Sequence, residues 1–323
     1  MISRREWLRI TAGAGATLSL NPSIIKAVQA QEIITRAIPG TSERLPSVGL
    51  GGANTFMRVA ANEDFSTIGS VLQALLDDGG TVLDTAAGYG DSEEVSGRVA
   101  QERGIADSLF WATKVNVVRR NRGGSSAGTN AADPTAVRAQ LERSFTRLRI
   151  PVIDLIQVHN MGDPPTQLGI LGEYKAEGRI RYMGITTTSE TQYPALADVM
   201  RNEPIDFIGI DYAVDNRIAE EVILPLAIER EIGVLVYLPF GRSRMWSRIG
   251  DRPVPDWAED FSAHTWAQFM LKFVIAHPGV TVATPGTSDP EHMLDNLAGG
   301  RGQLPTPDHL RRMVELVEGL PSA

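Results

Sequence analysis

The sequence contains no cysteine among its 323 residues, and it carries fewer basic than acidic side chains, 31 Lys and Arg against 39 Asp and Glu. Without cysteine there is neither a disulfide framework nor a thiol nucleophile. The net charge of −8 argues against nucleic acid as a partner. A hydrophobic content of 42% is enough for a sizeable core and argues against disorder.

The first thirty residues have the pattern of a signal peptide. Basic residues come early, a weakly apolar stretch covers 10–20, and Val28-Gln29-Ala30 forms a small-residue cleavage site. The stretch SRREWLR at 3–9 resembles a twin-arginine (Tat) export signal, with Trp7 standing where Phe is usual. We expect a signal peptide over 1–30, the Tat export machinery as partner, and a mature protein that starts near Gln31 in the periplasm.

Other interpretations of this leader are a basic amphipathic arm or a retained anchor helix, and a leader that does not function would leave the protein cytoplasmic. The apolar stretch is too short and too polar for a stable membrane span. Removal of the leader would leave 27 basic and 38 acidic residues, a net charge of −11.

From residue 31 to 323 strand-like and helix-like patterns alternate without a long linker, which predicts one domain. Strands are predicted at 48–50, 82–84, 110–114, 153–159, 182–186, 207–211, 234–237 and 280–284. Helices are predicted at 66–78, 92–102, 135–149, 168–177, 192–201, 216–231, 262–277 and 289–297. Eight β/α units predict an α/β fold, a (β/α)8 (TIM) barrel.

Several segments lie outside the eight repeats. A β-hairpin is expected at 32–46, where it can plug the bottom of the barrel, and a further helix at 306–319. Asp133-Pro134 and Asp289-Pro290 are N-cap signals for two helices. The long segments 115–132, with Arg119, Arg120 and Arg122, and 241–261 are predicted on the catalytic face as lids or, alternatively, as mobile solvated excursions.

Polar side chains follow three successive apolar runs. Asp84 and Tyr89 lie in LDTAAGYG, Lys114 in FWATKV and His159 in LIQVHN, and strand ends gather at the catalytic face of a barrel. Carbonyl reduction needs a proton donor at the oxygen as hydride arrives. A free phenol, with a pKa of about 10, needs a nearby cation to donate readily. Lys114 can be that cation, balanced by Asp84, while His159 orients the carbonyl.

Each of these residues alone is weak evidence, because such side chains more often cap, pack or face solvent. Together with longer motifs they identify a family: the chain closely resembles the aldo/keto reductases from about residue 45 to 296. The motifs are VGLGG at 48–52, LDTAAGYGDSEEVSG at 83–97, ATKV at 112–115, DLIQVHN at 154–160, GRIRYMGIT at 178–186 and PGTSDPEHMLDN at 285–296. The resemblance implies a catalytic tetrad of Asp84, Tyr89, Lys114 and His159, with Tyr89 as the acid/base.

The resemblance also implies NADP(H), bound extended on a barrel without a Rossmann domain, with NAD(H) as the less favoured cofactor. The positions implied to bind it are Gly52, Ala53, Asp84, Thr186, Thr187, Tyr237, Leu238, Pro239, Gly241, Gly286, Thr287, Ser288, His292 and Asn296. Tyr237 matches the aromatic residue that stacks on nicotinamide. Arg242 or Arg244 could reach the phosphates from the second lid. No metal site is expected.

Four departures from the family pattern concern the cofactor. Thr186-Thr187 replaces the usual Ser-Asn, Gly209 a Gln and Leu238 a Ser, and no Lys or Arg lies in the eighth-strand segment to pair with a 2′-phosphate. These changes bear on nicotinamide affinity. An exported enzyme would also need its cofactor loaded before export.

The expected substrate is a small-molecule aldehyde or ketone, and Trp246 and Trp257 indicate an apolar component in its pocket. A monomer or weak oligomer is expected. One rival reading is a non-catalytic nicotinamide-binding redox sensor or regulatory subunit. Another is an aldolase with a Schiff base on Lys114, although such a lysine should be desolvated rather than paired with Asp84.

Overall fold

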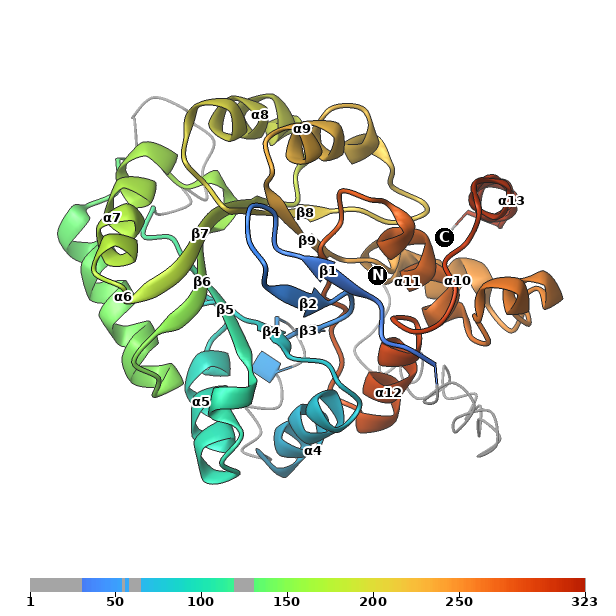
Figure 1. Ribbon diagram of the computed structural model, residues 1–323, viewed down its shortest axis with the longest axis horizontal. Coiled ribbons are helices and arrows are strands. Elements are labelled where there is room, and N and C mark those ends of the chain that lie inside the picture. The colour runs from blue at the N-terminus through green and yellow to red at the C-terminus, as the bar shows by residue number, and fades with distance from the viewer. Residues whose placement is uncertain (1–30, 54–55, 58–64, 119–130, 323) are drawn as a thin grey trace, which may run out of the picture.

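Parallel strands, each joined to the next through a helix, make up the centre of the molecule (Figure 1). The computed structural model describes residues 31–53, 56–57, 65–118 and 131–322. Its main sheet is ordered β10-β9-β8-β7-β6-β5-β4-β3. The strands are β3 (Leu50–Gly51), β4 (Val82–Asp84), β5 (Phe110–Val115), β6 (Ile153–Val158), β7 (Ile180–Thr187), β8 (Phe207–Asp211), β9 (Gly233–Tyr237) and β10 (Val282–Ala283). A parallel bridge from Val48 to Ala283 joins the two edges, so the predicted barrel is confirmed.

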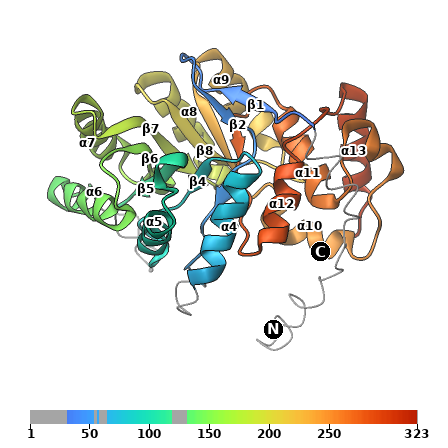
Figure 2. The ribbon, with the colours of Figure 1, turned by 60° about the horizontal axis from the view of Figure 1, so that its bottom comes forward.

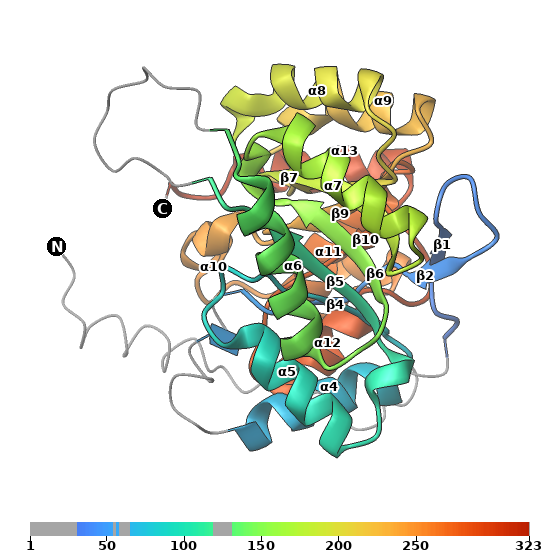
Figure 3. The same ribbon diagram turned by 90° about the vertical axis from the view of Figure 1, so that its left-hand side faces the viewer.

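Helices surround this sheet, as the two turned views show (Figures 2 and 3). They are α4 (Phe65–Asp77), α5 (Ser92–Glu102), α6 (Pro134–Leu148), α7 (Pro164–Ala176), α8 (Tyr193–Asn202), α9 (Ile223–Glu229), α11 (Trp266–Ala276) and α12 (Pro290–Ala298). The side chains of Asp133 and Asp289 accept hydrogen bonds from the N–H groups of Thr135 and Glu291. Both predicted caps are therefore present. The additional predicted helix is α13 (Pro307–Glu318).

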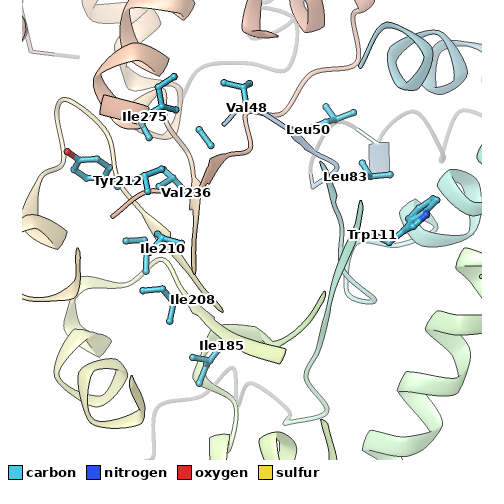
Figure 4. Close-up of a cluster of buried hydrophobic side chains, with 14 of the residues drawn as sticks. Val48, Leu50, Leu83, Trp111, Ile185, Ile208, Ile210, Tyr212, Val236 and Ile275 are labelled. Carbon is cyan, nitrogen blue, oxygen red and sulfur yellow. The ribbon is translucent and has the colours of Figure 1, made fainter. Parts of the chain in front are cut away.

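The strands bury both faces, as expected for a closed parallel sheet. In β8, Ile208 and Ile210 belong to the large apolar cluster between strands and helices, part of which Figure 4 shows. Phe207, on the opposite face, belongs to a second cluster with Leu235 and Val282 inside the barrel. Side-chain alternation along each strand thus divides the core into an outer layer and a smaller inner plug.

A hairpin closes the N-terminal end of the barrel. Strands β1 (Thr35–Ala37) and β2 (Arg44–Pro46) pair antiparallel, which confirms the predicted hairpin. Ile38 and Leu45 are 1% and 3% exposed and pack against the inner cluster at the strands' N-terminal ends. In Figure 3 the hairpin and the later helix α10 (Arg244–Ile249) lie at opposite ends of the barrel. The predicted plug is therefore present.

One predicted helix and one predicted loop need correction. The helix predicted at 216–231 is reduced to a 3-10 turn at Ile218–Glu220 and the short α9, because Ala213 and Asn216 first form a tight backbone bridge. The segment 241–261, predicted as a loop, contains α10 (Arg244–Ile249) and 3-10 turns at Gly241–Ser243 and Asp256–Phe261. Its apolar side chains Met245, Ile249, Ala258 and Phe261 are buried. It is a packed element and not a mobile excursion.

Some predictions fall outside the described residues. These are the leader over 1–30 and the arginines at 119, 120 and 122. Among the residues that the structure does describe, no helix has both the length and the apolar character needed to cross a membrane.

Candidate active site

A buried ion pair joins the ends of two neighbouring strands. Asp84 is the last residue of β4, and Lys114 lies in β5. The Nζ atom of Lys114 donates to Oδ2 of Asp84 at 2.5 Å and to the carbonyl of Thr85 at 2.7 Å. Burial raises the pKa of the Asp84 carboxyl, while the charge and hydrogen bond of Lys114 and a hydrogen bond from Tyr237 oppose that rise.

Tyr89 and His159 lie beside this pair. Tyr89 sits on the turn after β4, and its ring meets the imidazole of His159 edge-on, with centroids 5.7 Å apart. The Nζ atom of Lys114 is 5.2 Å from the centre of the Tyr89 ring. Asn116 donates to the carbonyl of His159 at 2.6 Å and holds the turn after β6. The structure therefore brings all four predicted catalytic residues together: a phenol, a cation, a balancing carboxylate and an imidazole, a set suited to proton transfer.

One further residue of this cluster, Gln157, was not among the sequence predictions. Its Nε2 donates to the Tyr237 hydroxyl at 2.9 Å, and that hydroxyl lies 3.2 Å from Oδ1 of Asp84. Burial, then the charge of Asp84, raises the pKa of Tyr237 well above its ordinary value. A signal for Gln157 was present, because His159 lies two positions later in the predicted strand 153–159, and period-two alternation predicts both on one face.

Gly209 makes room for the Tyr237 ring. A Cβ atom at this position would lie 2.5 Å from Cε2 of Tyr237, closer than a carbon contact permits. A Gln at this position, which is usual in the family, would therefore clash with the Tyr237 ring in this chain. Tyr237 is the residue that fills the space.

The two threonines predicted at the nicotinamide are buried and already bonded. The hydroxyl of Thr186 accepts from the N–H of Asn160 at 3.1 Å. That of Thr187 donates to Oε1 of Gln192 at 2.5 Å and accepts from the N–H of Ser189 at 3.0 Å. The Thr186 hydroxyl can still donate its hydrogen to another acceptor. The Thr187 hydroxyl bonds residues of the connection between β7 and α8.

The segment after β9 has an unusual backbone. Leu238, Gly241, Arg242 and Ser243 all have φ between 54° and 69°, in the left-handed region, and Pro239 is buried among them. Gly241 is required here because a Cβ atom would collide with the Asp215 carboxylate.

Two arginines of this segment pair with carboxylates at the end of β8 and just after it. Arg242 lies 2.8 Å from Asp211, and Arg244 lies 3.2 Å from Asp215. Both guanidinium-bearing side chains remain nearly half exposed, at 43% and 45%. Burial raises the pKa of Asp211, and the charge of Arg242 opposes the rise. The segment is therefore tied to the neighbouring strand end by ion pairs in which the carboxylates are buried and the arginine side chains are partly exposed.

Three residues of the predicted second lid have other roles. Arg248 donates to the carbonyls of Val317, Leu320 and Pro321 behind α13, and Arg252 donates within its own turn. Trp257 packs against Phe261, Phe269 and His309 and under the guanidinium of Arg312. The aromatic cluster beneath α13 therefore holds Trp257, and its place in a substrate pocket stays a prediction. Trp246 is 39% exposed and meets Phe240 edge-on.

The remaining predicted positions lie around β3 and β10. The N–H of Gly52 donates to the carbonyl of Asp84 at 2.7 Å, and Ala53 follows half-buried. The Thr287 hydroxyl accepts from the N–H of Asp289, which caps α12. Gly286 and His292 are exposed, Ser288 is partly buried, and Asn296 is buried. The exposed groups among these positions are the backbone at Gly286 and the imidazole of His292.

Comparison with known proteins identifies the family of this chain. The sequence model of the aldo/keto reductase family matches residues 47–315. The chain is 30% identical to aldo-keto reductase str7 of Strobilurus tenacellus over 63% of its own length, and 30% identical to aldo-keto reductase YhdN of Bacillus subtilis over 62%. These matches span 57% and 60% of the two relatives.

Among solved structures, an aldo-keto reductase from Klebsiella pneumoniae in complex with NADPH has the same fold. The TM-score is 0.69 at 24% identity, covering 89% of this chain and 95% of that one. The family model covers most of the sequence, and the barrel is the same fold as that of a solved aldo-keto reductase. The chain belongs to the aldo/keto reductase family.

Proposed function

We propose that this protein is an NADP(H)-dependent oxidoreductase that reduces an aldehyde or a ketone to an alcohol, with Tyr89 as the general acid. The observation that carries the proposal is the convergence of Tyr89 and His159 on the buried Lys114–Asp84 pair. Membership of the family supports the reaction class.

Each residue has a separate task in this reaction. When bound, the reduced nicotinamide supplies the hydride that attacks the carbonyl carbon. Tyr89 gives its phenolic proton to the carbonyl oxygen, so that an alcohol forms and a phenolate remains. Lys114 stabilises that phenolate, Asp84 balances the ammonium, and His159 orients the carbonyl.

Several described residues fit a nicotinamide dinucleotide. Tyr237 presents an aromatic ring 4.9 Å from Nζ of Lys114 at the catalytic end of the barrel. The half-exposed Arg242 and Arg244 are the cations that would hold the pyrophosphate. The adenosine end would rest on 286–288 and the first turn of α12, where helix N–H groups favour phosphate. NADP(H) is preferred over NAD(H) because the Klebsiella pneumoniae structure of this fold holds NADPH.

The test is consumption of NADPH, and separately of NADH, with a panel of small aldehydes and ketones. Tyr89→Phe should lower turnover by about 10² to 10⁴ while dinucleotide binding stays nearly unchanged, because only the proton donor is lost. Tyr174→Phe is a matched control, since Tyr174 lies on α7 and its hydroxyl bonds Glu142. Turnover of Tyr89→Phe within twofold of the unmodified protein would refute the role of Tyr89.

A non-catalytic nicotinamide-binding sensor is the second candidate. The engaged hydroxyl of Thr187 and the missing side chain at Gly209 favour it, since both remove polar groups that would orient the nicotinamide ring for hydride transfer, while Arg242 and Arg244 remain to hold the pyrophosphate. A sensor would bind NADPH yet reduce no carbonyl in the panel. An aldolase is disfavoured because Nζ of Lys114 is 2.5 Å from a carboxylate, which stabilises the ammonium rather than the amine needed for a Schiff base.

Export through the twin-arginine pathway, with the periplasm as destination, is also proposed. It rests on residues 3–9 and the cleavage site at 28–30 alone.

A further inference from the structure

We propose that Tyr237 is a positioning residue whose hydroxyl holds the Asp84 carboxylate in place against Lys114. This assignment rests on the proposed reductase function and adds to it a role for the Tyr237 hydroxyl that is separate from any contact of its ring with a cofactor.

Both oxygens of Asp84 have partners from different strands. Oδ2 accepts from Lys114 on β5 at 2.5 Å, and Oδ1 lies 3.2 Å from the hydroxyl of Tyr237 on β9. A carboxylate bound at both oxygens cannot rotate without breaking one bond. The ammonium is thereby fixed relative to Tyr89.

The direction of the second bond follows from the groups that are present. An ionised carboxylate only accepts, so the single hydroxyl hydrogen of Tyr237 points to Asp84. The Tyr237 oxygen is then left to accept from Nε2 of Gln157 at 2.9 Å. Gln157 is fully buried, and its Oε1 has no hydrogen-bond partner within the described residues. The amide therefore serves to orient the hydroxyl.

Gly209 is the steric condition for this arrangement. A Cβ atom there would lie 2.5 to 2.7 Å from Cε2, Oη and Cζ of Tyr237. Any larger residue at 209 pushes the phenol away from Asp84. The glycine and the tyrosine hydroxyl thus act as one unit.

The Tyr237 hydroxyl can be detected through the pKa of Asp84, which depends on the titratable groups around that carboxyl. They are Lys114 on β5, Tyr237 on β9, and Tyr89 on the turn after β4, with His159 against Tyr89. Burial raises the pKa of Asp84, and the Tyr237 hydrogen bond lowers it. Loss of the hydroxyl alone should therefore raise the pKa of Asp84 further.

The first experiment measures the kinetics of Tyr237→Phe. We expect kcat to fall about 10-fold or more, as for loss of a hydrogen bond to a charged group. The KM for the dinucleotide should change less than twofold because the ring remains. The acid limb of the pH profile should move to higher pH. Tyr212→Phe is the matched control, because its buried hydroxyl bonds Glu220 away from the tetrad. An unchanged kcat and profile in Tyr237→Phe would overturn the assignment.

The second experiment tests the coupling with Gly209. Gly209→Ala should lower kcat strongly when Tyr237 is present and have little further effect in the Tyr237→Ala background, where no ring can clash. Equal effects in the two backgrounds would contradict the steric role of Gly209.

A third measurement separates this proposal from the reductase function. The Asp84 carboxyl is titrated by ¹³C NMR, its signal identified by its loss in Asp84→Asn. It should titrate at higher pH in Tyr237→Phe than in the unmodified protein or in Tyr212→Phe. An unshifted titration overturns the contact whatever the activity. A shifted titration in a protein that reduces no carbonyl supports the contact and rejects the reductase function.

Discussion

The ammonium of Lys114 meets the carboxylate of Asp84 at 2.5 Å in a position where both side chains are at least 95% buried. A buried charge without its partner is costly, so each of these groups depends on the other. The consequence for catalysis is that the Lys114 ammonium is held in a fixed position beside Tyr89.

Lys114→Met should therefore lower turnover more at neutral than at acidic pH. Without the cation the phenolate that forms on Tyr89 is not stabilised, whereas at low pH solvent protons replace part of its function. The measurement is kcat against pH. Lys175→Met is the control, since Lys175 pairs with Asp206 at 2.6 Å on the outside of the barrel. A profile parallel to that of the unmodified enzyme would assign Lys114 a structural role only.

Arg242→Ala should raise the rate of dinucleotide release by about 10-fold, the effect expected for one charge-assisted hydrogen bond. The half-exposed guanidinium of Arg242 is held at the end of β8 by Asp211, within the left-handed segment after β9. Stopped-flow fluorescence of NADPH release measures this rate. Arg252→Ala should leave the rate unchanged because the Arg252 guanidinium donates to the carbonyls of Arg248 and Ile249 in its own turn. Equal rates in Arg242→Ala and the parent would exclude this contact.

Glu142→Gln should destabilise the protein by less than about 1 kcal/mol at neutral pH, because the group is half exposed and solvent screens its ion pair. Hydrogen bonds from Arg179 and Tyr174 lower the pKa of Glu142 from 4.5 to about 2. The folded pKa lies below the unfolded one, so this contribution is full above pH 4.5 and is lost as pH falls toward 2. Urea unfolding of both proteins at pH 7, 4 and 2.5 should show the difference shrinking. A difference that grows toward low pH would contradict the prediction.

Replacing Arg4 and Arg5 together by Lys should retain the protein in the cytoplasm with its leader uncleaved, if the leader belongs to the twin-arginine pathway. The unmodified protein should start near Gln31 outside the inner membrane. Cell fractionation and N-terminal mass analysis measure both. Lys26→Arg, a charge-preserving change outside the motif, is the control. Unmodified protein found only in the cytoplasm would reject export.

Pre-loading of the cofactor requires slow NADP(H) release as well. Dissociation within milliseconds would reject pre-loading even for an exported protein.

The barrel was predictable because its signals are local. Short apolar strands such as 82–84 and 207–211 match the observed β4 and β8, and the Asp-Pro caps place α6 and α12. The proximity of Asp84, Tyr89, Lys114 and His159 was predictable because strand ends of a parallel barrel gather at one face. Side-chain partners were harder to predict from the sequence, since the contact of Tyr237 with Gln157 joins residues 80 positions apart.

The segment 241–261 shows a second limit. Its length suggested a lid or a solvated excursion, but Arg248 bonds the carbonyl of Val317 and Phe261 packs against His309, both on α13 at the far end of the sequence. The position of Trp257 depends on the same helix, through His309 and Arg312. Periodicity within a segment carries no information about such distant contacts.

The hairpin that seals the N-terminal end of the barrel also constrains the order of events in the proposed reaction. In the part of the chain that the structure describes, Ile38 and Leu45 fill that end, so ligands must use the opposite opening. The dinucleotide and the carbonyl compound would then share one entrance. Whichever of them reaches deeper into the barrel has to arrive first and depart last, so steady-state kinetics should show a compulsory sequence of binding rather than a random one.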